Sequence, residues 1–243
     1  MTRSLWILAA IVVPVLAGTQ VHAIQLGTLV EGGIIEVGDK TFSNFEVHDV
    51  TAQSSTPADP LTIDVQGITN GFGEHGLRLS GIGAAVPDQG STGALRFILE
   101  YDVTVTDPLF LIHDVRHAFT SLSNRGGGMS LITQAGFPPD VNAFIQSVVG
   151  SGGTGELIPE VVDESETFVA DVVTQHMLHD FELHAQIVNL TSQGGPIVQG
   201  EINTSPIDLT FSQAAVPEPS TLLLLGTGAA ALVSRARRRM SRR

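Results

Sequence analysis

Cysteine is absent from the 243 residues of the chain, and aromatic residues other than phenylalanine are scarce. Without cysteine there is no disulfide, no thiol nucleophile and no thiolate metal site. A domain of roughly 190 residues buries enough surface to fold without disulfides. The chain also holds one Trp, which is Trp6 near the N-terminus, and one Tyr. This scarcity counts against a surface that stacks aromatic rings on sugars.

Basic residues are also few in the middle of the chain. Between residues 24 and 215 there are 5 basic and 24 acidic residues, so this part is more acidic than the whole chain, whose net charge is -13. Binding of nucleic acid depends on neutralising phosphates with Lys and Arg, so we expect no nucleic-acid partner. An acidic polysaccharide would be repelled as well, unless divalent cations bridge the two surfaces.

The N-terminus has the pattern of a secretory signal peptide. Arg3 gives a positive start, Leu5 to Ala17 form an apolar run broken only by Pro14, and small residues surround Ala23. This run is too short to span a bilayer comfortably, which takes about 20 residues. We therefore expect export, with signal peptidase cutting after Ala23. The alternative is an uncleaved N-terminal anchor.

The C-terminus carries a second apolar segment, Leu222 to Val233, followed by arginines. As a helix this segment would span about 18 Å, less than a hydrocarbon core of roughly 30 Å. A short transmembrane helix with a marginal fit suits a transient anchor, and the arginines predict that the tail lies on the cytoplasmic side. The predicted membrane residues include Leu222, Leu223, Leu224, Leu225, Gly226, Leu232 and Val233. The predicted cytoplasmic anchor consists of Arg235, Arg237, Arg238 and Arg239.

Alternation of apolar and polar residues predicts strands along most of the remaining chain. The clearest run covers 95–106, where only Ile98 interrupts the polar face, and a second run covers 177–187. Glycine clusters such as 126–128 separate the runs. Many strands spaced by turn residues predict an all-β fold, a single antiparallel β-sandwich of jelly-roll-like kind.

Three segments give less regular patterns. Phe42 and Phe45 are out of phase, which predicts a bulge or turn between them. Val141 to Val149 is the one segment whose period suits a helix, and that helix would be short. Ile158 to Glu166 is acidic and is predicted to be a solvated loop.

The tail reads Val216-Pro217-Glu218-Pro219-Ser220-Thr221, then the apolar run, then arginines. This arrangement resembles the PEP-CTERM sorting signal of exopolysaccharide-producing bacteria, a group also labelled as the C-terminal domain of ice-binding proteins. The resemblance covers 216–243 and implies an exosortase-type membrane enzyme as the partner that cuts near the motif. It makes Pro217, Glu218 and Pro219 a substrate site. The alternative is a plain C-terminal membrane anchor with a proline linker.

The physical chemistry of this motif agrees with that role. Proline lacks an amide hydrogen and biases the residue before it away from helix, so the two prolines favour an extended peptide just outside the membrane. A processing enzyme needs such a peptide, because a folded backbone cannot enter its cleft. Glu218 adds one charge between the prolines.

Histidines are the first candidates for a metal site. His113 and His117 lie four residues apart in a segment that looks extended, where they would be about 13 Å from each other and share no ion. In the second alternating run, His176 and His184 fall on the polar face together with Asp180, while His179 falls on the other face. His176 and His184 would be about 26 Å apart along that strand. We therefore predict a solvated face and no metal.

No catalytic residues and no cofactor are predicted. The chain contains neither G-x-S-x-G nor H-E-x-x-H, and a Ser-His-Asp triad is recognised only by its geometry. The acidic residues Asp163, Glu164 and Glu166 could contribute to a calcium site with distant ligands, but neither of the familiar calcium-loop patterns is present.

We therefore divide the chain into a signal peptide at 1–23, an exported domain at 24–215 and a sorting signal at 216–243. The resemblance and the acidic domain together predict a non-catalytic envelope or extracellular-matrix protein. It would be held briefly in the inner membrane and would then reside at the cell surface or in an exopolysaccharide biofilm. The alternatives are a secreted carbohydrate-binding module, which predicts a concave sheet face with exposed aromatics, and a secreted hydrolase.

Overall fold

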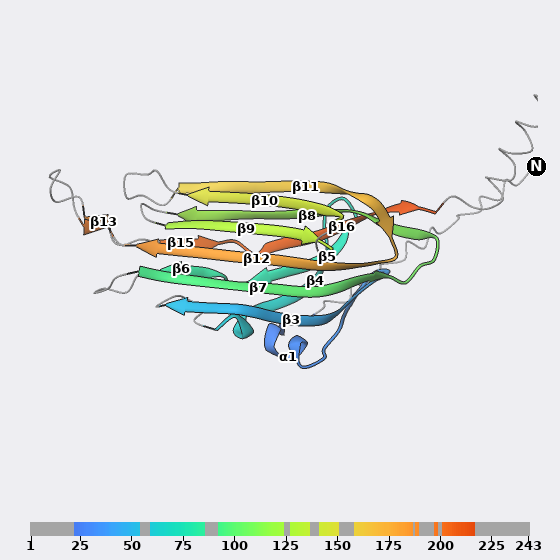
Figure 1. The fold of residues 1–243 in the computed structure, drawn as a ribbon, viewed down its shortest axis with the longest axis horizontal. Helices are drawn as coiled ribbons and strands as arrows, with labels where there is room; N and C mark the ends of the chain where they lie inside the picture. Colours follow the sequence, from blue (N-terminus) through green and yellow to red (C-terminus); the bar gives the residue numbers. More distant parts are fainter. Residues whose placement is uncertain are drawn as a thin grey trace, which may run out of the picture.

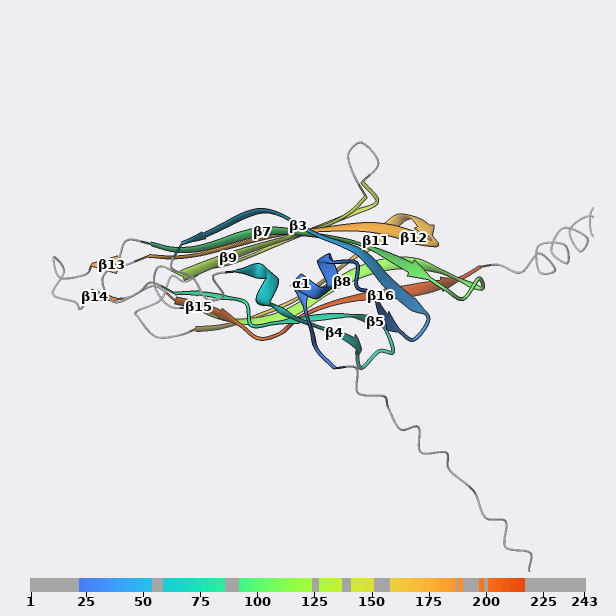
Figure 2. The ribbon, with the colours of Figure 1, turned by 90° about the horizontal axis from the view of Figure 1, so that it is seen from below.

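Two antiparallel sheets face each other in the computed structural model of the chain (Figure 1). The structure describes residues 22–53, 59–85, 92–123, 127–136, 141–150, 158–186, 188–189, 197–198 and 201–216. Seen from below, the sheets form two layers with a short helix at one open side (Figure 2). This arrangement confirms the predicted all-β fold of two packed sheets.

Eight strands form the first sheet, in which strand β8 is central because it pairs with three others. In spatial order they are β1 (Ile24–Gln25), β4 (Asp64–Thr69), β5 (His75–Ser80), β16 (Ile207–Ala215), β8 (Phe110–Ser123), β15 (Glu201–Thr204) and β6 (Gly83–Ala85), with β11 (Ile158–Val172) on the other side of β8. Strands β16 and β15 follow one another along the same side of β8.

Six strands form the second sheet. In spatial order they are β10 (Ala143–Gly150), β9 (Gly127–Ala135), β12 (Thr174–Gln186), β7 (Thr92–Val105), β3 (Lys40–Gln53) and β2 (Ile35–Val37). A separate pair joins β13 (Val188–Asn189) to β14 (Ile197–Val198). A single-turn 3-10 helix, η1 (Pro60–Thr62), precedes β4.

The alternating runs bury their apolar faces between the sheets, as the sequence predicts. In β7 every second residue from Leu95 to Val103 is fully buried. In β12 the partner of Phe97 is Phe181, and their rings stack with centroids 4.6 Å apart. Burying each such side chain contributes about 2 kcal/mol to folding.

An aromatic contact joins the two sheets directly. Phe42 of β3 lies 5.9 Å, centroid to centroid, from Phe211 of β16, and 6.0 Å from Tyr101 of β7. The helix α1 (Leu26–Val30) fills the open side of the sandwich with Leu26 and Leu29, both buried. The core therefore runs without interruption from one sheet to the other.

The predicted irregularity between Phe42 and Phe45 is confirmed. The register of β3 against β7 shifts between Ser43 and Glu46, and Asn44 adopts a positive φ of 55°. The shift lets both phenylalanines point inward although they are three residues apart, and each is at most 2% exposed.

The predictions of a helix at 141–149 and a loop at 158–166 are both wrong. Residues Ala143, Ile145 and Val149 of β10 face inward while Phe144 and Val148 are at least half exposed, which is a strand period. The acidic segment forms most of β11, which pairs with β8 at the edge of the sheet. An edge strand tolerates this acidity because its carboxylates reach solvent or cationic partners.

Among the described residues, no helix has both the length and the apolar character that a membrane crossing requires. The apolar segment Leu5 to Ala17 and the predicted transmembrane residues 222–233 lie outside the described residues.

Gly76 of β5 lies tightly against the backbone of β16. A Cβ at this position would overlap the backbone carbonyl oxygen of Leu209 in the neighbouring strand. We expect Gly76→Ala to lower the free energy of unfolding by about 3 kcal/mol, measured by urea unfolding followed by far-UV circular dichroism. The matched control is Gly71→Ala in the turn between β4 and β5, where a Cβ meets no atom within 4 Å. Equal losses in the two variants would contradict this interpretation.

Candidate functional site

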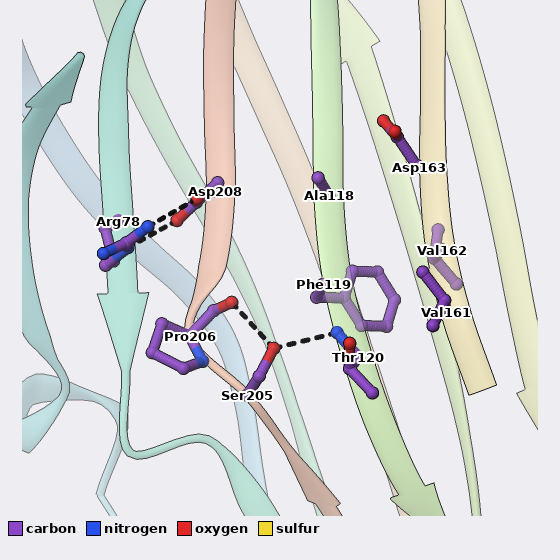
Figure 3. A pocket seen from close by; sticks show the side chains of 10 residues that line it. All are labelled: Arg78, Ala118, Phe119, Thr120, Val161, Val162, Asp163, Ser205, Pro206 and Asp208. Carbon is purple, nitrogen blue, oxygen red and sulfur yellow. Dashed lines mark hydrogen bonds and ion pairs between the residues drawn. The ribbon is translucent and has the colours of Figure 1, made fainter. Parts of the chain in front are cut away.

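A groove crosses the outer face of the first sheet over strands β5, β16, β8 and β11 (Figure 3). The register aligns one residue from each strand, since Arg78 pairs with Asp208, Asp208 with Ala118, and Ala118 with Asp163. We call the resulting hollow of about 420 Å³ the sheet groove. The small side chain of Ala118 leaves this space between the longer side chains on either side (Figure 3).

Two arginine–aspartate pairs flank the sheet groove. The guanidinium of Arg78 donates to both carboxylate oxygens of Asp208 at 2.6 and 2.7 Å. The guanidinium of Arg116 donates to both oxygens of Asp163 at 2.6 Å each. Hydrogen bonding to Arg116 lowers the pKa of Asp163, and hydrogen bonding to Asp208 raises the pKa of Arg78. Both pairs are therefore charged and held in a fixed geometry.

The end of the groove is shaped by the connection from β15 to β16. The Ser205 hydroxyl accepts a hydrogen bond from the Thr120 amide at 2.8 Å and donates to the Pro206 carbonyl at 3.1 Å (Figure 3). These bonds fix the turn against β8, and the exposed Pro206 ring lines the groove.

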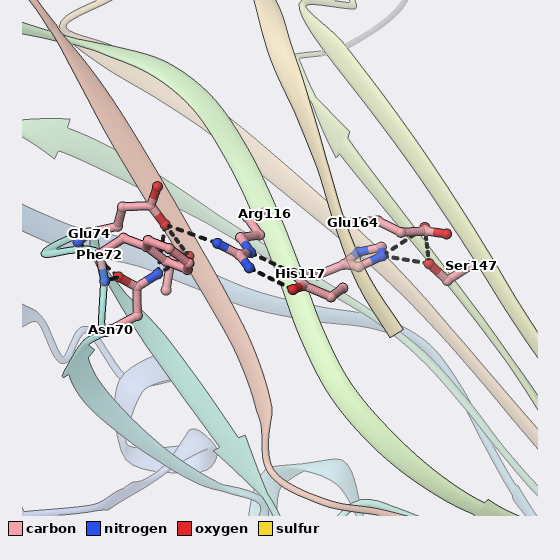
Figure 4. Close-up of polar contacts among 9 residues, drawn as sticks. Asn70, Phe72, Glu74, Arg116, His117, Ser147 and Glu164 are labelled. Carbon is pink, nitrogen blue, oxygen red and sulfur yellow. Dashed lines mark hydrogen bonds and ion pairs between the residues drawn. The ribbon is translucent and has the colours of Figure 1, made fainter. Parts of the chain in front are cut away.

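Arg116 extends this surface toward the turn between β4 and β5 (Figure 4). Its guanidinium carbon lies 4.6 Å from the ring centroid of Phe72, and one of its nitrogens lies 4.0 Å from Glu74. Asn70 holds the turn, because its side-chain oxygen accepts from the amides of Phe72 and Glu74 at 2.9 and 3.0 Å. Phe72 remains 74% exposed despite the cation–π contact.

Beneath the outer face, a chain of hydrogen bonds crosses the interior from one sheet to the other. We call it the buried polar chain. Its members, in spatial order, are Glu164, Ser147, His117, Thr133, His179 and Tyr101, from β11, β10, β8, β9, β12 and β7. Apart from Glu164, each of these side chains is at most 3% exposed. Figure 4 shows the end at which Glu164, Ser147 and His117 meet.

The two ends of the buried polar chain determine the direction of its hydrogen bonds. Burial raises the pKa of Tyr101 strongly, so its hydroxyl keeps its proton and donates to His179 Nε2 at 2.9 Å. His179 then donates from Nδ1 to the Thr133 hydroxyl at 3.0 Å. Thr133 in turn donates to His117 Nδ1 at 3.1 Å.

At the other end of the buried polar chain, His117 donates toward Ser147 and Glu164. With Nδ1 accepting, its proton lies on Nε2 and points to the Ser147 hydroxyl at 2.5 Å. The Ser147 hydroxyl donates to the carboxylate of Glu164, which can only accept when ionised. Every donor and acceptor along the chain is thus satisfied when both histidines are neutral.

The charge state of the histidines follows from their burial. Desolvation lowers the pKa of His179 to about 3. Desolvation also lowers the pKa of His117, although Glu164 partly offsets this effect. Both rings are therefore neutral near pH 7.

The arrangement of Ser147, His117 and Glu164 differs from that of a catalytic triad. In a triad the serine and the carboxylate occupy opposite nitrogens of the imidazole. Here both Ser147 and Glu164 lie on Nε2, at 2.5 and 3.3 Å, while Nδ1 faces Thr133. Ser147 is also only 3% exposed, so no substrate carbonyl has access to its hydroxyl.

Two of the other histidines singled out from the sequence, His113 and His176, bond to carboxylates. His113 is the extra residue at a β-bulge in β8 and bonds to Asp171 at 2.8 Å. His176 lies between Asp102, 2.8 Å from Nδ1, and Glu100, 3.3 Å from Nε2. His184 is exposed on the outer face of β12. No group of three metal-binding side chains forms within the described part of the chain.

The acidic residues considered for calcium do not converge. Asp163 points outward to Arg116, whereas Glu164 reaches inward to His117 and Ser147. Glu166 is exposed farther along β11.

The ends of the folded domain lie next to the predicted processing sites. Ala23 is exposed and directly precedes β1, whose first residue, Ile24, pairs with Val65. At the other end, β16 finishes at Ala215, and the Val216 amide donates to the Leu109 carbonyl at 2.8 Å. Pro217, Glu218 and Pro219, the predicted membrane residues and the arginines lie outside the described residues.

Sequence reasoning missed the buried polar chain and the sheet groove. One signal for the chain was present, because His117, Thr133 and His179 each occupy an inward position in an alternating strand, between apolar neighbours. For the groove no local signal exists, since its four strands come from four distant parts of the sequence.

Thr133 is the midpoint of the buried polar chain, which makes it the most informative residue to change. Thr133→Val removes one acceptor and one donor and leaves two buried imidazole nitrogens without partners, so we expect a loss of about 3 kcal/mol in the free energy of unfolding. Thr133→Ser keeps the hydroxyl and should recover most of the lost free energy of unfolding.

The control is Thr104→Val, which removes a hydrogen bond to Thr174 on the outer face of the second sheet. Its loss should stay below about 1 kcal/mol. Urea unfolding measures all three variants, and equal losses for Thr133→Val and Thr104→Val would refute the assignment.

Buried neutral histidines also make stability depend on pH. In the unfolded chain each of these histidines takes up a proton near pH 6.5, whereas in the folded chain it does so only at lower pH. Their contribution to the free energy of unfolding is therefore fully present above pH 6.5 and is lost as the pH falls. The contribution of His179 falls by about 1.4 kcal/mol per pH unit between its unfolded pKa and its folded pKa of about 3. Urea unfolding at pH 7.5 and pH 5 should show a smaller difference for His179→Gln than for the natural chain. An unchanged difference would mean that His179 is protonated in the folded state.

Comparisons with known proteins bear on the C-terminus and on the sandwich. A model of the PEP-CTERM protein-sorting motif matches residues 215–239. None of the curated proteins compared with the chain is significantly similar to it. Among solved structures, the chain is similar to TmCBM61 in complex with β-1,4-galactotriose, with 10% identity, 71% of this chain and 90% of that chain covered, and a TM-score of 0.31.

A second similar structure is arabinose-bound MgGH51 α-L-arabinofuranosidase, with 11% identity, 80% of this chain and 27% of that chain covered, and a TM-score of 0.26.

The motif match confirms the resemblance seen in the Pro-Glu-Pro segment, the apolar run and the arginines. The chain carries a PEP-CTERM protein-sorting motif, which implies an exported protein with a membrane-associated C-terminal sorting signal that an exosortase-type enzyme processes.

Proposed function

We propose that the chain is a non-catalytic matrix protein whose β-sandwich is delivered outside the cell by a two-step relay. Signal peptidase removes residues 1–23 after Ala23, and the segment 222–233 then halts in the inner membrane with its arginines on the cytoplasmic side. An exosortase-type enzyme cuts at Pro217-Glu218-Pro219 and frees or transfers the domain. The domain then resides at the cell surface or in the exopolysaccharide of a biofilm.

The observation that supports this relay is the position at which the folded domain ends. The last strand of the first sheet finishes at Ala215, the Val216 amide still bonds to Leu109, and the motif follows at the next residue. A cut at the motif therefore leaves every described strand and every described core residue in the sandwich. The prolines cannot donate to a sheet, which keeps the peptide after Val216 available to an enzyme.

The character of the domain supports a role in the matrix. With 24 acidic and 5 basic residues between 24 and 215, it carries a charge that favours solubility outside the membrane. The arrangement of Ser147, His117 and Glu164 supports a structural role for these side chains rather than acyl transfer.

A second candidate function, a secreted carbohydrate-binding module, is favoured by the sheet groove. This alternative predicts a concave sheet face with exposed aromatics. The outer face of the first sheet has the groove, and Phe72 beside Arg116 is 74% exposed.

The sorting step is tested by replacing Pro217, Glu218 and Pro219 together with alanine. We expect the variant to stay at its uncut length in the membrane fraction of the producing cells, because the enzyme loses the extended acidic peptide that it reads. The natural chain should appear outside the cells in a shorter form. Intact-mass measurement of both fractions gives the lengths.

The matched control replaces Pro159 and Glu160, the same residue types within β11, with alanine. This control should be shortened and released like the natural chain. Release of the Pro217, Glu218 and Pro219 variant at the normal length would refute processing at the motif.

A further inference from the structure

The geometry points to the sheet groove as a binding site for a neutral glycan chain, and we propose this as the ligand class of the sandwich. The inference deepens the second candidate function, carbohydrate binding, and rests on the proposed delivery to the matrix for the place where such a ligand is met. It follows from the shape, the polar groups and the apolar walls of the groove on the outer face of the first sheet.

The size of the groove suits a sugar unit. Asp208 and Asp163 pair with Ala118 from its two sides, so they lie two strand spacings apart, or about 10 Å. The hollow between them measures about 420 Å³, which falls within the range of small-molecule sites. The residues that line it extend across the row of strands from Arg78 of β5 to Val161 of β11 (Figure 3).

The polar groups are suited to hydroxyls. Each sugar hydroxyl both donates and accepts, and each arginine–aspartate pair offers donors and acceptors side by side. The pairs are fixed before binding, because each guanidinium already donates twice to its carboxylate. Arg78 is 41% exposed and Asp163 is 48% exposed, so hydrogen-bonding positions remain open to a ligand. Such preorganisation lowers the entropic cost of binding.

Apolar surface lies beside these polar groups, as the C–H face of a sugar ring requires. Val161 is 75% exposed at one wall, Ala118 lies between the walls, and Pro206 lies at the end (Figure 3). Phe72 continues the surface on the far side of Arg116.

The charges of the groove select against ionic ligands. Its two arginines are each neutralised by an aspartate, so no free charge attracts an anion. The surrounding domain is strongly acidic and repels polyanions such as uronic-acid polymers and nucleic acids.

A peptide strand is a poor fit as well. Strands β16 and β8 beneath the groove are hydrogen-bonded on both sides, and the edge strand β11 forms the outer wall, so the hollow between Asp208 and Asp163 offers a peptide no free edge. The neutral glycan is the ligand class that uses the hydroxyl-directed pairs and the apolar walls together.

The test uses the protein recovered from the envelope of the producing cells and isothermal titration with cellohexaose, mannohexaose and galactohexaose. We expect at least one of these neutral oligosaccharides to bind. Hexamannuronate, which carries a carboxylate where mannohexaose carries a hydroxymethyl group, should bind roughly tenfold more weakly or not at all. Failure of all three neutral probes to bind, or a preference for hexamannuronate over mannohexaose, would overturn the proposal.

Two variants locate the site. Ala118→Trp fills the groove and Arg78→Ala removes one fixed pair, and each should weaken binding roughly tenfold or more. The matched control is Arg96→Ala, which breaks the equivalent Arg96–Asp180 pair on the outer face of the second sheet. Its affinity should stay within about twofold of that of the natural chain. If Ala118→Trp fails to fold, judged by circular dichroism, the comparison of Arg78→Ala with Arg96→Ala decides, and equal affinities would overturn the groove assignment.

These outcomes are separable from those of the sorting step. Loss of glycan binding with normal shortening of the chain overturns the ligand assignment alone. Normal glycan binding by a chain that is never shortened overturns the relay alone.

Discussion

The hydrogen bond from the Val216 amide to the Leu109 carbonyl ties the end of the described sandwich to the connection between β7 and β8. Before that bond, β16 pairs with β5 over 207–211 and with β8 over 208–215, and it contributes Phe211 to the aromatic core. Directly beyond it lies Pro217, which has no amide hydrogen and cannot extend the pairing. The segment that matches the PEP-CTERM protein-sorting motif begins at Ala215, so the sandwich and the motif meet at the last residue of β16. The proposed release depends on this boundary, because an enzyme that had to cut within β16 would remove part of the core.

The interior of the sandwich is held by two different kinds of contact. Most of it is apolar. The contact between the Phe42 and Phe211 rings joins the sheets and involves no directional hydrogen bond. The buried polar chain is the exception, because His117, Thr133 and His179 are satisfied in only one direction of donors and acceptors. Such a network adds specificity to the packing of β8 against β9 and β12, since any shift in register would leave buried polar atoms without partners. It also links the edge strand β11 to the core through Glu164.

The sequence was informative wherever a local pattern determines the structure. The alternation in β7 and β12 and the phase break between Phe42 and Phe45 predicted two strands and a bulge correctly, since burial on one face imposes period two. The segment 158–166 was wrongly predicted as a loop because its acidity hides the pairing with β8, which lies about 40 residues earlier in the chain. The segment 141–149 was ambiguous because short apolar runs fit both periods.

The sheet groove depends on the spatial order of β5, β16, β8 and β11, which no local pattern contains. The motif at the C-terminus was identified from its residues alone, because its three parts follow one another in the sequence.

The central claim is that the exported molecule is the sandwich alone, bounded by Ile24 and by the end of β16. The most direct measurement is the intact mass of the protein recovered from outside the producing cells, together with sequencing of its two terminal peptides. The account predicts an N-terminus at Ile24 and a C-terminus near Val216, with the apolar run and the arginines absent. A secreted or surface form that retains Arg235 and the residues after it would contradict the account and would leave a plainly anchored sandwich in its place.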